Sequence, residues 1–158
     1  MQTINTYSFS ELSEEAKEKA LSDYRSSGFE YAWQDENHES LKAFCNLFNI
    51  KVTDWSIGTW GHSYIKTDAE NSHFRGWNKA KVAAIPEFLT GYCLDCDFTE
   101  TFKREFEKNG DALYSFNEAV DSGLKAWIND LEDQESDEYI ADFLIANEYQ
   151  FLENGRML

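Results

Sequence analysis

The hydrophobic and polar positions of this chain follow two different periods. Where apolar residues recur every three or four positions, one face of an α-helix is predicted. That spacing occurs in five stretches: residues 14–28, 31–48, 97–108, 111–133 and 136–146. Where apolar and polar residues alternate, a strand with one buried side is predicted. That alternation occurs in three stretches: residues 2–9, 50–78 and 149–152.

Capping residues sharpen the helix boundaries. Ser13 and Ser136 each precede two acidic residues, so each serine is placed to cap a helix whose positive first turn holds carboxylates. Gly28 and Gly110 follow predicted helices at the position where glycine commonly ends one. Residues 79–90 remain open, because they fit either a helix that Pro86 ends or a further strand.

The mixture of periods predicts an α+β fold. We expect a small antiparallel sheet, built from the N-terminal, central and C-terminal strands, packed against four or five helices. The chain has one proline and no Pro-rich or Gly/Ser-rich linker, so a single domain over residues 1–158 is expected. Aromatic side chains make up 16% of the residues, which supplies a core and argues against disorder.

Net charge is the most informative feature of the composition. The chain has 30 acidic and 14 basic side chains, a net charge of −16. Residues 51–82 hold five bases and three acids, a local +2, so the remaining residues carry −18. A field of that sign repels nucleic acid and anionic membrane surfaces and attracts basic proteins. The sequence therefore predicts a basic protein partner, with no direct binding to nucleic acid or membrane.

Location is predicted from what the sequence lacks. No apolar stretch approaches the roughly 20 residues of a membrane span. The N-terminal residues show no basic segment followed by an apolar run, as a secretory signal would. Three cysteines are too few for a disulfide framework and indicate free thiols. We therefore expect a cytoplasmic protein, a monomer or a small homo-oligomer.

Two groups of residues are candidate partner-binding sites. The first is an acidic segment without a basic residue, containing Asp130, Glu132, Asp133, Glu135, Asp137, Glu138 and Asp142. It is either a solvated helix end or a surface with the charge pattern of DNA phosphates. The second is an aromatic group in the least acidic region, containing Trp55, Trp60, Tyr64 and Trp77. It could anchor a protein partner or stack on bases, or it could simply pack on the face of the sheet.

The motif Cys93-Leu94-Asp95-Cys96 is the one sequence feature that resembles a chemical site. A redox pair needs a lowered thiol pKa, but Asp95 and Asp97 oppose formation of the thiolate. A zinc site needs two further ligands, and the three histidines show no paired spacing. Buried or semi-buried small hydrophobic side chains are the simpler interpretation of both cysteines. We therefore expect no enzyme, no metal and no cofactor.

Two stretches resemble a known family. Residues 9–20, FSELSEEAKEKA, and residues 146–156, ANEYQFLENGR, are similar to the terminal motifs of small, largely uncharacterised accessory proteins of tailed bacteriophages and prophages, sometimes labelled antitoxin-like. The resemblance implies a phage accessory gene that acts on a host process or on host defence. It implies no catalytic residues, and it does not extend to the Cys-x-x-Cys motif.

Charge and resemblance together lead to one main hypothesis and two alternatives. The main hypothesis is a phage-encoded acidic inhibitor that binds a nucleic-acid-handling defence protein of the host, of the anti-CRISPR or anti-restriction type, by presenting carboxylates where that protein expects phosphates. The first alternative is an antitoxin-like or regulatory protein-binding module. The second is a small enzyme or metal protein that uses Cys93 and Cys96.

Overall fold

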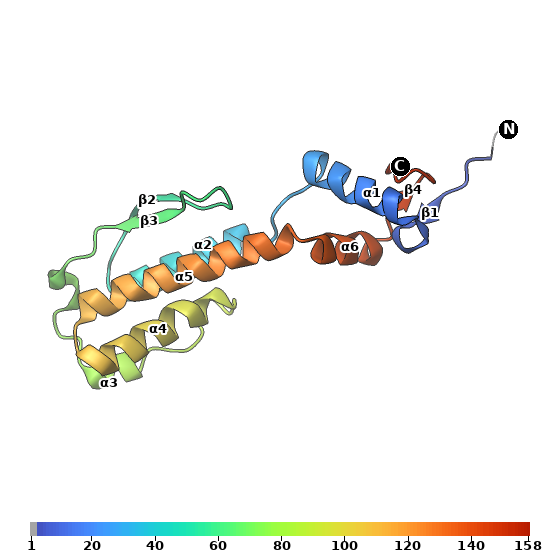
Figure 1. The fold of residues 1–158 in the computed structure, drawn as a ribbon. Coiled ribbons are helices and arrows are strands. Elements are labelled where there is room, and N and C mark those ends of the chain that lie inside the picture. The colour runs from blue at the N-terminus through green and yellow to red at the C-terminus, as the bar shows by residue number, and fades with distance from the viewer. Residues whose placement is uncertain (1–2) are drawn as a thin grey trace. The chain divides into compact units, whose positions relative to one another are not determined.

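The computed structural model describes residues 3–158 and confirms the α+β class. It contains two antiparallel pairs of short strands and six α-helices (Figure 1). The elements are β1 (Tyr7–Ser8), α1 (Glu14–Ser27), α2 (Gln34–Asn46), β2 (Val52–Ser56), β3 (Tyr64–Thr67), α3 (Lys79–Ala83), α4 (Leu94–Asn109), α5 (Ala112–Gln134), α6 (Asp137–Ala146) and β4 (Gln150–Phe151). Among the described residues, no helix has the length and apolar composition of a membrane-spanning segment.

The described residues form two compact units. Unit 1 combines residues 3–32 with residues 132–158, and unit 2 comprises residues 33–131. The expectation of a single domain stays a prediction, and each unit is described by itself.

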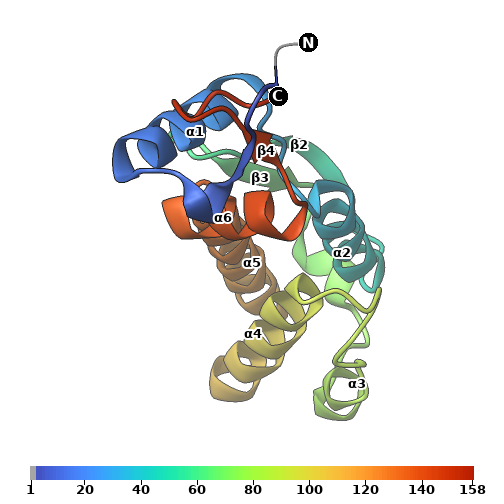
Figure 2. The ribbon, with the colours of Figure 1, turned by 90° about the vertical axis from the view of Figure 1, so that its right-hand side faces the viewer.

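Unit 1 is built from two segments that are far apart in the sequence. Helix α1 begins where expected, because the Ser13 hydroxyl accepts a hydrogen bond from the amide of Ala16 at 3.2 Å. Strands β1 and β4 pair antiparallel, with Tyr7 opposite Phe151, beside α1 and α6 (Figure 2). The core between these elements comprises Phe9, Leu12, Ala16, Ala20, Leu21, Tyr24, Ile140, Leu144 and Phe151. Residues 9–20 and residues 146–156 therefore fold against each other.

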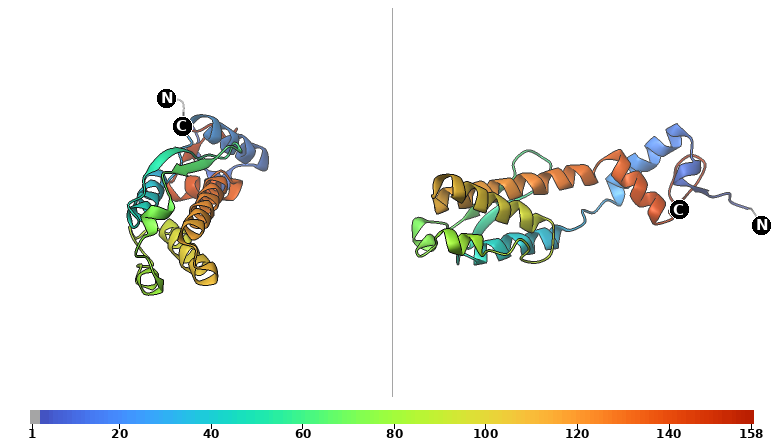
Figure 3. Two further views of the ribbon diagram at one scale, coloured as in Figure 1. Left: turned by 90° about the vertical axis from the view of Figure 1, so that its left-hand side faces the viewer. Right: turned by 90° about the horizontal axis from the view of Figure 1, so that it is seen from below.

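Unit 2 is organised around a stack of three phenylalanines. Phe44 of α2 lies between Phe98 of α4 and Phe116 of α5, with ring centroids 5.2 Å and 5.3 Å apart and the rings nearly parallel. All three rings are completely buried. Helices α2, α4 and α5 consequently run alongside one another, as Figures 1 and 3 show. The arrangement follows from the helical spacing of the apolar residues, which gives each helix one buried stripe.

Strands β2 and β3 form the hairpin expected in the central region. The register places Trp55 opposite Ile65 and Ser56 opposite Tyr64, with an irregularity between Val52 and Asp54. Because side chains alternate across a strand, Trp55 and Tyr64 point to opposite faces of the hairpin.

The structure corrects several details of the sequence prediction. The terminal and central strands do not share one sheet but form two separate pairs, β1–β4 and β2–β3. The strand expected over residues 2–9 shortens to Tyr7–Ser8, and Gln2 lies outside the described residues. Residues 79–83 are helical, and α4 begins at Leu94 rather than at residues 97–99. The physical reason for this earlier start is the Asp95 side chain, described below.

Helix α5 passes close to α4 at Gly123. A Cβ atom at this position would lie 2.0 Å from Cε1 of the buried Phe98 ring. In an exposed helix, replacing glycine with alanine stabilises by about 1 kcal/mol. Here we expect Gly123→Ala to lower the free energy of unfolding by about 2 kcal/mol, because the Phe98 ring must leave its stack. Urea unfolding measures the change, and Asn129→Ala, on the exposed side of the same helix, is the control. A stabilised Gly123→Ala variant would contradict the close approach.

Candidate functional site

A concave site lies within unit 2, where α2, α4 and α5 come together. Its cavity has a volume of about 360 Å³. Three aromatic and three carboxylate side chains line it, together with small and apolar residues. The aromatic residues are Trp33, Tyr92 and Trp127, and the carboxylates are those of Glu36, Asp97 and Asp130. We refer to this cavity as the α2–α4–α5 pocket.

A buried carboxylate holds the loop that forms one wall of the pocket. Asp95, the second residue of α4, is completely buried and turns back over the preceding loop. Its oxygens accept hydrogen bonds of 2.7–2.9 Å from the amides of Leu89, Thr90 and Gly91 and from the Thr90 hydroxyl. This network orders the chain immediately before α4, which explains why the helix begins within the Cys-x-x-Cys motif. The central aspartate of the motif therefore has a clear structural role.

The hydrogen bonds also set the ionisation of Asp95. Burial raises the pKa of this carboxyl, but hydrogen bonds from the Ser40 hydroxyl and the loop amides outweigh burial, and the pKa ends below its ordinary value. Asp95 is therefore a stabilising carboxylate at neutral pH.

Asp97 provides a contrast two residues later. Burial, and secondarily the charge of Glu100, raises the pKa of the Asp97 carboxyl above its ordinary value. No lysine or arginine forms an ion pair with it among residues 3–158. Asp97 is half-buried in the pocket, where its negative charge costs stability instead of adding to it.

The opposite pKa shifts give opposite effects of pH on stability. A carboxyl whose pKa is lowered by folding stabilises above its unfolded pKa of about 4, and this contribution is lost as the pH falls through the folded pKa. We therefore expect the stability advantage of the wild type over Asp95→Asn to shrink between pH 5 and pH 2.5. Asp97→Asn should be more stable than the wild type at pH 7, with a difference that fades as Asp97 becomes protonated at lower pH. Melting temperatures measured across this pH range test both expectations. Parallel plots of melting temperature against pH for the three proteins would contradict the opposite pKa shifts of Asp95 and Asp97.

Trp33 stands at the rim of the pocket in an unfavourable backbone conformation. It occupies the N-cap position of α2 with φ of +66° and ψ of +14°, in the left-handed region. For a bulky residue this conformation is a genuine outlier and costs about 1–2 kcal/mol. The residue is 56% exposed, and its indole ring lies 6.3 Å, centroid to centroid, from the ring of Tyr92. The strain thus holds a large aromatic ring at the pocket mouth without burying it.

Trp127 is the buried aromatic side chain of the pocket. It is 1% exposed, and its indole N–H donates a 2.6 Å hydrogen bond to Oε1 of Gln34 on α2. The ring of His38 packs edge-on against it, with centroids 5.4 Å apart. Burial lowers the pKa of His38, so this side chain is neutral near pH 7.

The structure distributes the predicted acidic segment over both units. Asp130 lines the pocket of unit 2, and the other six acids belong to unit 1. Two of those six have partners in the same unit: Asp137 pairs with Arg25, and Glu135 accepts from the hydroxyl of Tyr31. The exposed members are Glu132, Asp133, Glu138 and Asp142, together with the paired Asp137.

The predicted aromatic group does not form one cluster. Trp55 packs edge-on against His38, with centroids 4.1 Å apart, while the Tyr64 hydroxyl bonds to Asp54 on the other face of the hairpin. Trp77 contacts Phe48 of the core at 4.7 Å. Trp60 is 62% exposed and its ring lies over Gly58. Packing therefore accounts for Trp55 and Trp77; the role of the group in partner binding stays a prediction.

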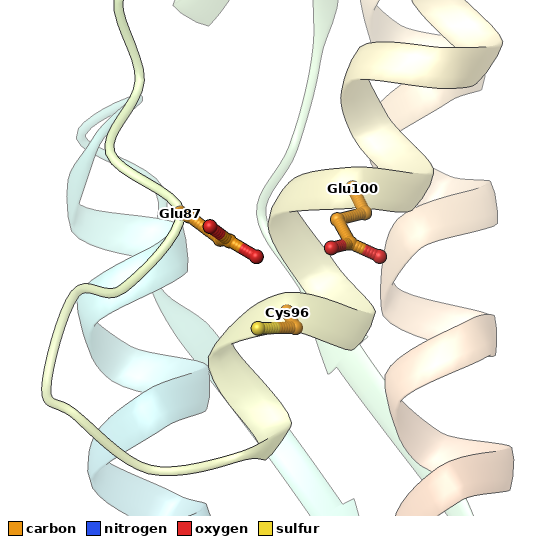
Figure 4. Close-up of side chains that lie close together, drawn as sticks. All are labelled: Glu87, Cys96 and Glu100. Carbon is orange, nitrogen blue, oxygen red and sulfur yellow. The ribbon is translucent and has the colours of Figure 1, made fainter.

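The three cysteines are free thiols in different surroundings. Cys45 is buried, and burial raises its pKa to about 12. Cys96 lies on α4 near Glu87 and Glu100, with the potential ligand atoms of all three within 4.8 Å of one another (Figure 4). Burial, followed by the charges of the two glutamates, raises the pKa of Cys96 and keeps it a thiol near pH 7. Cys93 is not part of this group, so the motif does not act as a paired ligand set there.

Comparisons with protein-family models, with curated proteins and with solved structures each found no match. The function of the chain is therefore argued from the chemistry of its own surface and pocket.

Sequence reasoning missed the α2–α4–α5 pocket. The sequence prediction places Trp33 inside a helix, although this residue forms the cap. It treats Asp97 as a helix start and as a charge beside the cysteines, and it does not single out Tyr92. One signal was available: a Thr-Gly turn followed closely by an aspartate at a helix start, which is typical of a carboxylate that caps its own loop. Nothing in the spacing indicated that α5 would supply Trp127 and Asp130 to the same site.

Proposed function

We propose that this chain is a phage-encoded acidic protein that inhibits a nucleic-acid-handling defence protein in the bacterial cytoplasm by occupying its basic surface. The observation that carries the proposal is the charge of unit 1. Its residues hold 14 acidic and 4 basic side chains, a net charge of −10. A groove whose lysine and arginine side chains normally bind phosphates would attract this surface, and the attraction would increase the association rate of the two proteins.

In the described part of the chain, the basic side chains of unit 1 leave several of its exposed carboxylates without an ion pair. Three of the four are already engaged in ion pairs, Lys17 with Glu14, Lys19 with Asp23, and Arg25 with Asp137. The exposed carboxylates of Glu132, Asp133, Glu138 and Asp142 have no such ion pairs among residues 3–158. We refer to these four as the acidic face.

Helix stability explains the placement of only one member of the acidic face. Glu138 lies in the first turn of α6, where the helix dipole favours a carboxylate. Glu132 and Asp133 lie in the last turn of α5, where the helix dipole is negative and disfavours carboxylates. Asp142 is four residues from Glu138 on α6, so two like charges are neighbours on one side of the helix. The three carboxylates that gain nothing from the local helix electrostatics support a role in binding a cation-rich partner.

An affinity capture from bacterial lysate tests the proposal. The immobilised protein is incubated at low and at high salt, and bound proteins are identified by mass spectrometry. We expect capture of a nucleic-acid-handling defence protein at low salt, with release by high salt or by competing duplex DNA. Neutralising the acidic face, by converting its four carboxylates to amides, should abolish the capture.

A matched variant separates the acidic face from total charge. Converting the exposed carboxylates of Glu15, Glu18, Glu107 and Asp121 to amides gives the same net change, from −16 to −12. It should retain the partner. If both variants lost the partner to the same extent, total charge and not the acidic face would be responsible for the capture. Capture of a single small partner that resists salt would replace the proposal with the antitoxin-like alternative, and absence of any nucleic-acid-handling partner would overturn it.

A further inference from the structure

We propose that the α2–α4–α5 pocket receives the guanidinium group of an arginine side chain of the partner protein. The inference rests on the proposed function, which requires a basic partner, and adds where that partner is anchored. The pocket lies wholly within unit 2 and is distinct from the acidic face of unit 1.

The pocket gathers negative charge from three helices. Glu36 on α2, Asp97 on α4 and Asp130 on α5 all contribute to its lining, and no lysine, arginine or histidine does. Asp97 is the most informative of these groups, because it is half-buried and no basic residue among residues 3–158 pairs with it. A carboxylate that is withdrawn from water without an internal cation is well suited to an external one.

Aromatic side chains complete the recognition chemistry. Trp33 and Tyr92 are exposed at the mouth, and Trp127 is buried against α2. Aromatic faces attract cations through the negative charge of the ring face, with tryptophan the strongest. An apolar, aromatic lining combined with a few converging carboxylates therefore selects an organic cation over a hydrated metal ion.

The backbone of Trp33 points to function over stability. The left-handed region favours glycine or asparagine, and an indole side chain there is both strained and solvent-exposed. Neither feature contributes to the core of unit 2. Strain of this kind is concentrated at binding sites, where the surrounding structure positions a side chain for a ligand.

Arginine fits this set of groups better than lysine. Its guanidinium is planar, stacks on aromatic rings, offers donors to more than one carboxylate and is more weakly hydrated than an ammonium group. The volume of about 360 Å³ lies near the lower end of the range for ligand pockets and suits a single side chain. Arginine is also enriched at the energetic centres of protein interfaces.

A titration with small probes tests the pocket without the partner. The full chain is titrated with N-acetyl-argininamide, with N-acetyl-citrullinamide as its uncharged analogue of the same length, and with N-acetyl-lysinamide. Backbone and indole N–H resonances report the site of binding. We expect weak, saturable binding of the arginine probe, with shifts confined to Trp33, Trp127 and residues 91–97. The citrulline probe should not bind, and the lysine probe should bind more weakly.

Two variants and one control make the result decisive. Trp33→Gly removes the ring at a position where glycine is unstrained, and Asp97→Asn removes one charge; each should weaken arginine binding about tenfold. Asp121→Asn makes the same charge change on the exposed side of α5 and should bind as the wild type. Equal binding of the citrulline probe, wild-type affinity in Asp97→Asn, or shifts spread over exposed carboxylates would each overturn the inference.

The two proposals fail in different ways. If the arginine probe does not bind but lysate capture still yields a salt-sensitive nucleic-acid-handling protein, the pocket assignment falls and the proposed function stands. If the probe binds as expected and no such protein is captured, the pocket assignment stands and the proposed function falls. Capture of the partner at wild-type level by Trp33→Gly and by Asp97→Asn would overturn the pocket as the anchor.

Discussion

Replacing Asp95 with alanine is expected to lower the free energy of unfolding of unit 2 by about 4 kcal/mol. The substitution leaves the amides of Leu89, Thr90 and Gly91 without their common acceptor. A buried donor left unsatisfied costs about 1–3 kcal/mol. The loss at each of these amides lies toward the lower end, because the hydrogen bonds are part-buried and the loop can rearrange. For a unit of this size we expect the melting temperature to fall by about 20 °C.

Two further variants define the cause of that loss. Asp95→Asn keeps a carbonyl oxygen for the three amides, which all bond to Oδ2, but replaces Oδ1, the acceptor of the Thr90 hydroxyl, with a donor and removes the charge, so it should recover only part of the stability. Asp121→Ala removes an exposed aspartate from the same unit and should change the free energy of unfolding by less than about 0.5 kcal/mol. An Asp95→Ala variant as stable as Asp121→Ala would show that the network around α4 is not formed.

Replacing Gly155 with alanine is expected to destabilise unit 1 by about 3 kcal/mol. Gly155 has φ of +84°, and a Cβ atom here would lie 2.1 Å from the carbonyl oxygen of Ala16 in α1. The obstacle is backbone, so the turn must move away from the helix. That turn is closed by a 2.8 Å hydrogen bond from the amide of Leu152 to the carbonyl of Arg156.

Gly61 provides the matched control. It also has a positive φ, of +90°, but nothing lies within 4 Å of its Cβ position. Gly61→Ala should therefore cost only the backbone strain, about 1 kcal/mol. Hydrogen exchange of the α1 amides, together with thermal unfolding, measures the difference. Equal effects of the two substitutions would mean that the turn does not press on α1.

The elements of the fold were predictable where local chemistry decides them. Ser13 and Ser136 cap α1 and α6 through hydrogen bonds to amides three residues on, and Gly110 ends α4 with φ of +67°. Such boundaries depend on a few neighbouring residues. The pairing of β1 with β4 was less predictable from the sequence, because Tyr7 and Phe151 are brought together by a core of residues that are distant in the chain.

The candidate site was predictable only in its charge. The acidic segment can be singled out from the sequence, but its division between the two units, and the pairing of Asp137 with Arg25, depend on tertiary structure. The Cys93-x-x-Cys96 motif marks the loop that Asp95 holds in place, and Cys93 itself lines the pocket. Spacing alone cannot show that Asp95 is completely buried while Cys93 is exposed.

The construction of unit 1 from two distant segments also sets an order of events during synthesis. Helix α1 emerges from the ribosome before residues 33–131, whereas α6 and β4, which complete its core, emerge after them. At ordinary translation rates this leaves α1 without its partners for about 5–20 s. During that interval the side chains of Leu21 and Tyr24 are open to chaperones and proteases. The abundance of this protein in a cell is therefore sensitive to how quickly residues 132–158 follow.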